Sequence, residues 1–286
     1  MEFNDDDLCN SYVATLLSTE RITPPDTAEV RHLVLQLPEG DFTFHEGQCV
    51  AVLLPGPHEF GNSHHMRLYA IASSQTGEGR QPGRISICVR RCFYIDPVSG
   101  ERYPGKASNY LCDAAVGDDL LIAGPYGAHF EIPKDPASNL LMVGAGTGIA
   151  PFRGFVKRIY GELGGWQGKV RLFYGARTGM EMLYMNDMNK DLHLYYDERT
   201  FQAFEAVSPR PHFDEPAALD RVLADNAREV WEMVQEPKTH VYVAGLMEAA
   251  QQFDKAMSAM AGSEDAWHRM RQRLISQQRY AELLHE

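Results

Sequence analysis

A short glycine-rich stretch, VGAGTGIAPF, lies where an apolar run changes into a helical pattern. The run NLLMVGAG predicts a strand, and IAPFRGFVKRIYGEL predicts the helix that follows it. Gly144, Gly146 and Gly148 allow a tight turn, and Pro151 suits the first turn of a helix. A helix that begins there directs backbone N–H groups toward an anion. The stretch is neither a Walker loop nor a G-x-G-x-x-G motif, so a phosphate site and a turn without ligand are both open.

The rest of the second half continues this alternation of strand and helix patterns. Three further strands are expected, at KVRLFYGA, FQAFEAVS and THVYVAG. Helices are expected near EMLYMNDMNK, through EPAALDRVLADNAREVWEMVQ and through MEAAQQFDKAMSAMA. Strands that alternate with helices form a parallel sheet with helices on both faces. We therefore expect an α/β domain.

The carboxyl ends of these strands carry glycine, small polar residues and arginine. Ligands of open α/β sheets bind outside such ends. Arg177 and Arg210 are the only basic residues there, and a guanidinium fork suits phosphate oxygens. Solvated loop arginines are the simpler alternative for each. The strand ends considered are Gly144–Thr147, Gly175–Thr178, Val207–Arg210 and Ala244–Leu246.

The first part of the chain has only strand patterns. Its short runs include EVRHLVLQL, QCVAVLLPG, RLYAIAS, RISICVRRCFY and DDLLIAGPYG, separated by glycine, proline and aspartate. Many short strands of this kind predict a closed barrel or a sandwich. EIPKDPAS, with Pro133 and Pro136, is a plausible boundary because proline cannot donate to a sheet. We expect domains at residues 1–134 and 135–286.

Composition narrows the function classes. The chain has 286 residues with 27 basic and 39 acidic side chains, a net charge of −12, which argues against nucleic-acid or acidic-membrane binding. The five cysteines have no metal-site spacing, and Cys88 and Cys92 are expected as buried, reduced thiols. The acidic start resembles neither a signal nor a transit peptide, and no apolar run is long enough to span a membrane. A cytoplasmic protein without a metal site is expected.

Several motifs occur in a fixed order along the chain. They include RLYAIASS, ISICVRRCFY, ASNYLCD, GDDLLIAGPYG, GTGIAPFR, FYGARTGMEMLY and HVYVAGLMEAAQQFDKAM. Together they resemble the plant-type ferredoxin–NADP reductase family, over nearly the whole chain. The resemblance implies an N-terminal antiparallel FAD-binding β-barrel followed by a C-terminal Rossmann-like parallel α/β domain that binds NADP(H).

The resemblance also implies a set of FAD-binding residues. Arg67 would meet the pyrophosphate, with Leu68 beside it, and Tyr69 would stack on the flavin ring. Tyr94 would stack on the adenine. Backbone N–H groups of Lys106, Ala107 and Ser108 would hold the pyrophosphate, and the flavin would be lined by Ala70, Cys88, Val89 and Arg90.

The nicotinamide nucleotide would be bound by residues of the second domain. The family pattern implies Thr147, Ala176, Arg177, Gly245 and Leu246 for the dinucleotide, and Ser208 and Arg210 for a 2′-phosphate. This pair favours NADPH over NADH, although Asp214 and Glu215 would repel a phosphate and His212 would help. NADH is therefore kept as the alternative coenzyme.

The chain departs from the family pattern at several positions near the implied reaction centre, including Ala145, which replaces a threonine in the glycine turn. Ala70 stands where the family has serine, and Ala244 stands where it has cysteine. Leu283 falls where a carboxylate is usual, and His285, followed by Glu286, falls where a terminal tyrosine is usual. Tyr69, Ala70, Ala244 and His285 are thus the candidate catalytic positions. Hydride transfer depends mainly on positioning, so we expect the chemistry to survive at an altered rate.

The function that the resemblance implies is electron transfer between NAD(P)H and a separate one-electron carrier, ferredoxin or flavodoxin, through FAD. The chain has no C-x₄-C-x₂-C run for a cluster of its own. Two alternatives stay open, the reductase component of a multi-component oxygenase and a non-catalytic, regulatory FAD-binding protein. Candidate cations for docking an acidic carrier are Arg84, Arg90, Arg91, Arg102 and Lys106.

Overall fold

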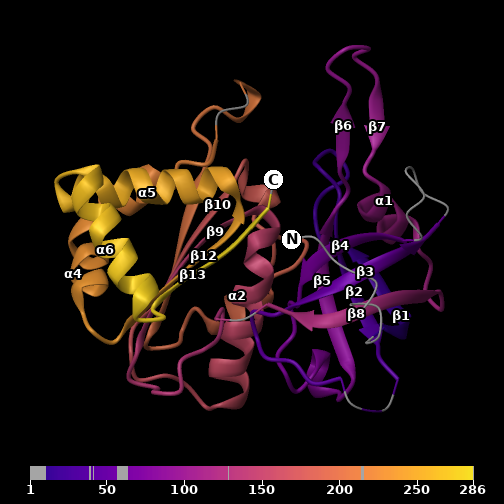
Figure 1. Cartoon of the computed structure of the whole chain (residues 1–286), viewed down its shortest axis with the longest axis horizontal. Coiled ribbons are helices and arrows are strands. Elements are labelled where there is room, and N and C mark those ends of the chain that lie inside the picture. Colours follow the sequence, from indigo (N-terminus) through magenta and orange to yellow (C-terminus); the bar gives the residue numbers. More distant parts are fainter. Residues whose placement is uncertain are drawn as a thin grey trace. The chain divides into compact units, whose positions relative to one another are not determined.

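The computed structural model describes residues 11–38, 40, 42–56, 64–127, 129–213 and 216–285. The chain forms two compact units, Met1–Ala128 and His129–Glu286, each with its own sheet (Figure 1). The boundary between residues 134 and 135 was expected to separate an FAD-binding domain from an NAD(P)-binding domain, and it stays a prediction. Among the described residues, no helix has the length and apolar character needed to cross a bilayer.

The first unit is built on a six-stranded antiparallel sheet with the order β4-β3-β8-β1-β2-β5. An isolated bridge between Ile71 and Ile87 joins the region after β4 to β5, and the Ala72 N–H donates to the Ser86 carbonyl at 2.7 Å. The sheet thus closes on itself, and the barrel is the correct one of the two expected architectures. Its strands are β1 Ser11–Arg21, β2 Val30–Gln36, β3 Cys49–Pro55, β4 His64–Ala70, β5 Arg84–Arg90 and β8 Asp119–Tyr126.

Alternate residues of these strands fill the barrel. Leu33 and Leu35 of β2 and Val50 and Val52 of β3 are fully buried in one apolar cluster, as the period of two predicts. After β5 the chain forms a hairpin of β6 Phe93–Ile95 and β7 Arg102–Pro104, which leads directly into α1 Lys106–Asp113. The sequence pattern predicted β5 and β6 as one run.

The second unit contains a five-stranded parallel sheet with the order β11-β10-β9-β12-β13. It has the expected Rossmann-like arrangement, with α2 Ile149–Val156 on one face and α4 Ala227–Gln235, α5 Met247–Ala261 and α6 Glu264–Ser276 on the other (Figure 1). Lys157–Glu162 continues α2 with a wider, π-type turn. The strands are β9 Asn139–Ala145, β10 Val170–Ala176, β11 Phe201–Val207, β12 Thr239–Leu246 and β13 Tyr280–His285.

Two expected helices of this unit are wrong in detail. Residues 181–190 form turns instead of a helix, because the Asn186 side-chain oxygen accepts from the N–H groups of Met188 and Asn189. The helix expected through residues 215–235 is interrupted at Asn226, which separates α3 Leu219–Asp225 from α4. Strand β13 was not predicted, although its register beside β12 brings the end of the chain to the sheet.

Candidate functional site

The beginning of α1 is the part of the first unit best suited to an anion. The first intrahelical bond runs from the Asn109 N–H to the Gly105 carbonyl at 3.1 Å. The backbone N–H groups of Lys106, Ala107 and Ser108 precede that bond, in the first turn of the helix. The side chain of Ala107 is buried in the barrel core. Any contact of Ala107 with a ligand is therefore made by its backbone, as expected.

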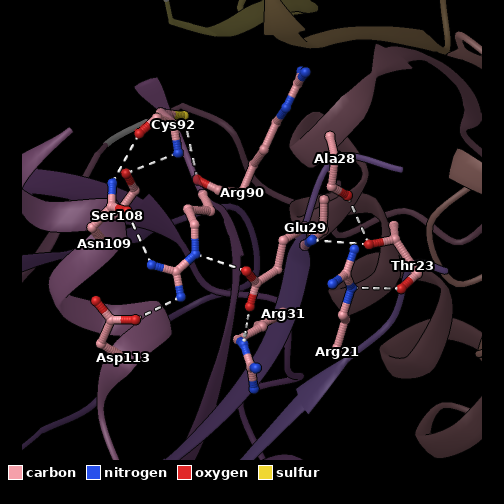
Figure 2. Close-up of polar contacts among 12 residues, drawn as sticks. Arg21, Thr23, Ala28, Glu29, Arg31, Arg90, Cys92, Ser108, Asn109 and Asp113 are labelled. Carbon is pink, nitrogen blue, oxygen red and sulfur yellow. Dashed lines mark hydrogen bonds and ion pairs between the residues drawn. The ribbon is translucent and has the colours of Figure 1, made fainter. Parts of the chain in front are cut away.

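The base of the β6–β7 hairpin is tied to the same helix end (Figure 2). Ser108 Oγ accepts from the Cys92 N–H at 3.1 Å, and Asn109 Nδ2 donates to the Cys92 carbonyl at 2.9 Å. The Gly105 N–H donates to that carbonyl as well, at 2.9 Å. The helix end and the hairpin therefore move as one piece.

A charged network fixes α1 against β5 and the β1–β2 connection (Figure 2). Arg91 Nε donates to Glu29 at 2.7 Å, its Nη1 to Asn109 at 3.0 Å, and its Nη2 to Asp113 at 2.7 Å. Arg31 holds the other oxygen of Glu29 at 2.6 Å. Burial alone would raise the pKa of Glu29, but the bonds from Arg91 and Arg31 outweigh it and lower that pKa.

This network corrects one sequence-based assignment. Arg91 was expected to be one of the cations that dock an acidic carrier protein. Its guanidinium instead forms ion pairs with Glu29 and Asp113, and its side chain is mostly buried. The guanidinium of Arg102 lies over the Phe93 ring at 3.7 Å, and Arg84 donates to Gln36. Arg90 is exposed and extends away from the network (Figure 2).

The end of β4 and the end of β5 meet at the bridge that closes the barrel. Antiparallel register from the Ile71–Ile87 bridge makes Ala70 and Cys88 neighbours. Tyr69 is half-buried and packs against the barrel core, and burial raises its pKa. Val89 is fully buried in that core, so only its backbone can reach a ligand. Arg67 and Leu68 are exposed.

The thiols of this unit differ in exposure. Burial raises the pKa of Cys49 to about 12 and that of Cys112 to about 11, which makes both unreactive. Cys88 is buried as expected, but Cys92 is exposed at the hairpin base, so the expectation of two buried thiols is wrong for Cys92. Cys9 lies outside the described residues.

The second unit gathers its candidate residues at one edge of the sheet, where all parallel strands end. Thr147 follows β9, Ala176 ends β10 with Arg177 directly after it, and Ser208 and Arg210 follow β11. Gly245 and Leu246 end β12, beside Leu284 and His285 of β13. The sequence prediction that these residues share an edge therefore agrees with the strand order.

The glycines of this edge have two different roles. A Cβ on Gly148 would lie 2.3 Å from the Ala244 carbonyl oxygen, and one on Gly245 would lie 2.3 Å from the Ala145 oxygen. These glycines let the turn and β12 pack backbone against backbone. Gly146 has φ +56° and nothing within 4 Å of the Cβ position, so its outer side is open. Of these three glycines, Gly146 is the one with space for a ligand.

Three further contacts shape this edge. The buried Tyr174 donates its hydroxyl to the Gly146 carbonyl at 2.8 Å, which holds the glycine turn from below. Arg177 donates through Nε and Nη2 to the Pro211 carbonyl at 2.8 and 2.6 Å. Ser208 Oγ accepts from the Arg210 N–H at 3.3 Å. Arg177, Ser208 and Arg210 are thus brought into one loop cluster, whereas Asp214 and Glu215 lie outside the described residues.

Three of the positions that depart from the family pattern, Ala244, Leu283 and His285, lie in neighbouring strands of the second unit. Ala244 is paired in register with Leu283 and, on its other side, with Gly144. His285 Nε2 lies 3.5 Å from Thr147 Oγ1. This part of the edge is thus apolar at Ala244 and Leu283, with Thr147 and His285 as polar neighbours. Glu286 lies outside the described residues.

Sequence reasoning did not identify Tyr174 and Tyr103, which shape these sites. It named Arg91 as a docking residue but missed its role in fixing α1. Tyr103 stacks on Tyr94, with ring centroids 5.3 Å apart and an angle of 21° between the rings. Tyr103 lies nine positions after Tyr94, and only the cross-strand pairing of the hairpin brings the two rings together. A hairpin prediction could have found this pair, but Arg91 and Tyr174 left no local signal.

Comparison with known families matches both units. Residues 14–131 match the family model of the oxidoreductase FAD-binding domain, and residues 142–254 match that of the oxidoreductase NAD-binding domain.

Three relatives that match most of this chain are all named ferredoxin–NADP reductase. A ferredoxin–NADP reductase of Spirulina sp is 35% identical over 262 residues, covering 90% of this chain and 88% of the relative. One from Synechocystis sp. is 35% identical over 237 residues, covering 81% of this chain but 57% of that longer protein. One from Spinacia oleracea is 34% identical and is covered to 69% of its length, with 88% of this chain matched.

Solved structures agree on the fold. Ferredoxin-NADP+ reductase from Plasmodium falciparum with 2'P-AMP has a TM-score of 0.73 and 17% identity, with 97% of each chain covered. Another structure from Plasmodium falciparum, titled only by that enzyme name, has a TM-score of 0.70 with the same identity and coverage. At this identity the likeness establishes the two-part architecture alone.

Proposed function

Because the chain belongs to the ferredoxin–NADP reductase family, we propose that it is an FAD-dependent NADP(H) oxidoreductase that exchanges electrons with a small carrier protein. The observation that carries the proposal is the division of the two required sites between the two units. The first unit presents a helix end suited to the FAD pyrophosphate, and the second presents strand ends suited to a dinucleotide.

The residues of the first unit fit FAD. We assign the pyrophosphate to the N–H groups of Lys106, Ala107 and Ser108, because a helix N-terminus favours anions. Exposed Arg67 adds a guanidinium that suits phosphate oxygens. Exposed Tyr94 offers a ring for the adenine, and Tyr69 one for the flavin. The flavin is further lined by Leu68, Ala70, Cys88, Arg90 and the backbone of Val89.

The residues of the second unit fit a nicotinamide dinucleotide. The open side of Gly146 and the start of α2 suit a pyrophosphate, and Thr147 supplies a hydroxyl. Ala176, Gly245 and Leu246 lie at the ends of neighbouring strands. We assign a 2′-phosphate to Ser208 and Arg210, with Arg177 holding the loop, so NADPH is the proposed coenzyme and NADH the alternative.

FAD, when bound, accepts a hydride from a reduced nicotinamide and releases the electrons one at a time. The protein's own contribution is to bind and orient. The side chains of Ala70, Ala244 and Leu283 cannot donate or accept a proton, so they contribute only apolar surface to the proposed sites. The hydroxyl of Thr147, just after β9, and the imidazole of His285, in β13, are polar groups at the same strand ends. Orientation by fixed neighbours can supply a large part of a rate enhancement.

The relatives' name supports ferredoxin as the carrier, and we propose flavodoxin as a second carrier of the same kind. With Arg91 removed from the candidate cations, the proposed docking residues are Arg84, Arg90, Arg102 and Lys106. We also propose a reducing compartment such as the cytoplasm, which the free thiols of Cys49, Cys88, Cys92 and Cys112 support.

One observation favours a second candidate, a slow or regulatory FAD protein. Ala244 and Leu283 are paired in register, so two of the positions that lost polar groups lie side by side. A site stripped of stabilising contacts loses about 10²–10³ in rate for each at a well-tuned centre. A reductase serving an oxygenase would keep the proposed chemistry and differ only in its carrier.

Anaerobic stopped-flow mixing tests the proposal. The FAD-loaded protein is mixed with NADPH and, separately, with NADH, and loss of the visible flavin absorption is followed. Fast bleaching by one coenzyme is the expected result and identifies that coenzyme. Bleaching by both coenzymes that is slower than any plausible turnover would rule out the reductase, and equally fast bleaching by both would rule out the NADPH assignment.

A further inference from the structure

The β6–β7 hairpin is a small ribbon whose two faces differ. Pairing of Tyr94 with Tyr103 places these rings on one face. Phe93, Ile95, Arg102 and Pro104 point to the other face because side chains alternate along a strand. Two-stranded hairpins are barely stable by themselves in water. The ribbon therefore needs internal contacts to hold any side chain in one place.

The structure supplies such contacts at three levels. At the tip, one carboxylate oxygen of Asp96 accepts from the N–H groups of Val98 and Ser99 at 2.9 and 2.7 Å. In the middle, Arg102 covers Phe93, and Tyr103 donates its hydroxyl to Glu101. At the base, the bonds of Cys92 with Gly105, Ser108 and Asn109 join the ribbon to the start of α1.

The Tyr94–Tyr103 pair forms an exposed aromatic surface on one face of this ribbon. The rings are nearly parallel, and Tyr94 is 58% exposed while Tyr103 is 38% exposed. One face of the Tyr94 ring thus rests on Tyr103, and the residue still presents most of its surface. A ring already fixed by a neighbour costs less rotamer entropy when a base stacks on it.

We propose that Tyr103 is a positioning residue, which holds the ring of Tyr94 in place for the adenine of FAD. The inference rests on the proposed FAD site and extends it to a residue that binds no ligand itself. Tyr94 lies two residues beyond Cys92, about 7 Å along the strand. One ribose can bridge that distance from a pyrophosphate at the start of α1.

Flavin titrations of the full-length apoprotein test this proposal. FAD and FMN are titrated against wild type, Tyr94→Ser, Tyr103→Ser and Tyr103→Phe, with flavin fluorescence as the readout. Tyr94→Ser is expected to weaken FAD about 5- to 100-fold, since base stacking on an aromatic ring is worth that much. Tyr103→Ser is expected to weaken FAD about 3- to 10-fold, as for loss of an aromatic pair. Tyr103→Phe retains the ring and should bind FAD as wild type does.

Two comparisons separate positioning from a structural effect. FMN has no adenine, so its affinity should be unchanged in every variant. Tyr103→Ser should have no further effect on the Tyr94→Ser background, because it acts through that ring. Val98→Ser, at a tip residue that is 95% exposed, is the matched control and should bind both flavins normally.

Several outcomes would overturn the proposal. These are equal losses of FAD and FMN affinity, additive effects of the two serine substitutions, or unchanged FAD affinity with weakened carrier reduction, which would make the hairpin a protein-docking element. If a stable apoprotein cannot be prepared, the FAD dissociation rate of the holoprotein after dilution gives the same ratios. A wild type that binds FAD but is not reduced by NADPH would refute the proposed function and leave this inference standing.

Discussion

The two units hold their candidate sites by different means. The strand edge of the second unit is fixed by close backbone packing, with no room for a Cβ at Gly148 or Gly245. The helix end of the first unit is fixed by charges, since Arg91 joins Glu29 and Asp113 across three segments. Steric packing depends little on salt or pH, whereas a partly exposed ion network depends on both.

This difference also separates the two sites experimentally. The three tryptophans, Trp166, Trp231 and Trp267, all lie in the second unit. Tryptophan fluorescence therefore follows the sterically fixed unit, and release of FAD follows the charged one. Each substitution below is expected to move one signal more than the other.

The largest effect is expected for Gly245→Ala. Gly245 has φ +113°, and an added Cβ would lie 2.3 Å from a backbone oxygen that cannot move without the sheet. Strained backbone and overpacking together should cost about 4 kcal/mol of unfolding free energy. Urea unfolding followed by tryptophan fluorescence measures this cost.

Gly179→Ala is the matched control, because the Cβ position of Gly179 has nothing within 4 Å and its φ is not positive. It should change stability by less than about 0.5 kcal/mol, as surface substitutions usually do. Equal stability of the two variants would show that the edge relaxes and is not sterically fixed.

A smaller effect is expected for Arg91→Leu, in the first unit. The change leaves Glu29 with only Arg31 and should cost about 2 kcal/mol, less than a fully buried pair because Asp113 is exposed. FAD should be released at a lower urea concentration, while the tryptophan transition stays in place. Arg84→Leu, which removes an arginine of β5 that bonds the neutral side chain of Gln36 and is assigned no contact with FAD, is the control. A shift of both signals by Arg91→Leu would contradict the separation of the two units.

The same contrast explains what the sequence could predict. Strands, the parallel order and the shared strand edge follow from local hydrophobic period and from glycines in the turn, and both units have the expected fold class. The barrel network joins Arg91 to Glu29, 62 positions earlier, and to Asp113, 22 positions later. No local pattern marks such partners, so Arg91 looked like any exposed cation.

Local competition explains the failed helix at residues 181–190. Its composition suits a helix, but the Asn186 side chain captures two backbone N–H groups, and Tyr184 adopts φ +61° while fully buried. The candidate catalytic positions Tyr69, Ala70, Ala244 and His285 rest on the family resemblance alone. The two alanines have no reactive group, so nothing in their chemistry would mark them as part of a reaction centre.

A third effect, of about 1 kcal/mol, is expected for Tyr174→Phe. This change removes the hydroxyl that donates to Gly146 and leaves the ring in the core. Binding of 2′,5′-ADP should weaken, and the tryptophan transition should shift slightly. Tyr242→Phe is a suitable control, because its hydroxyl donates to the Glu131 carbonyl and not to the turn. Equal loss of nucleotide affinity in both variants would remove any special role for Tyr174.

The smallest effect is expected from acid, and it tests the charged network without removing any atom. The bond from Arg91 lowers the pKa of Asp113, and the pKa of Glu29 lies below its ordinary value of 4.5 although burial opposes this. Carboxyls with lowered pKa values stabilise the folded state above the unfolded pKa. That stability is lost as the pH falls through the folded value.

FAD retention should therefore decline below about pH 4.5, and more steeply in wild type than in Arg91→Leu, where most of this contribution is already absent. Glu229 of the second unit, whose pKa is also lowered because Arg171 outweighs burial, is unchanged by this substitution. The tryptophan signal should consequently have the same acid dependence in both proteins. If FAD retention also had the same acid dependence in both proteins, the beginning of α1 would be held by packing, as the strand edge of the second unit is.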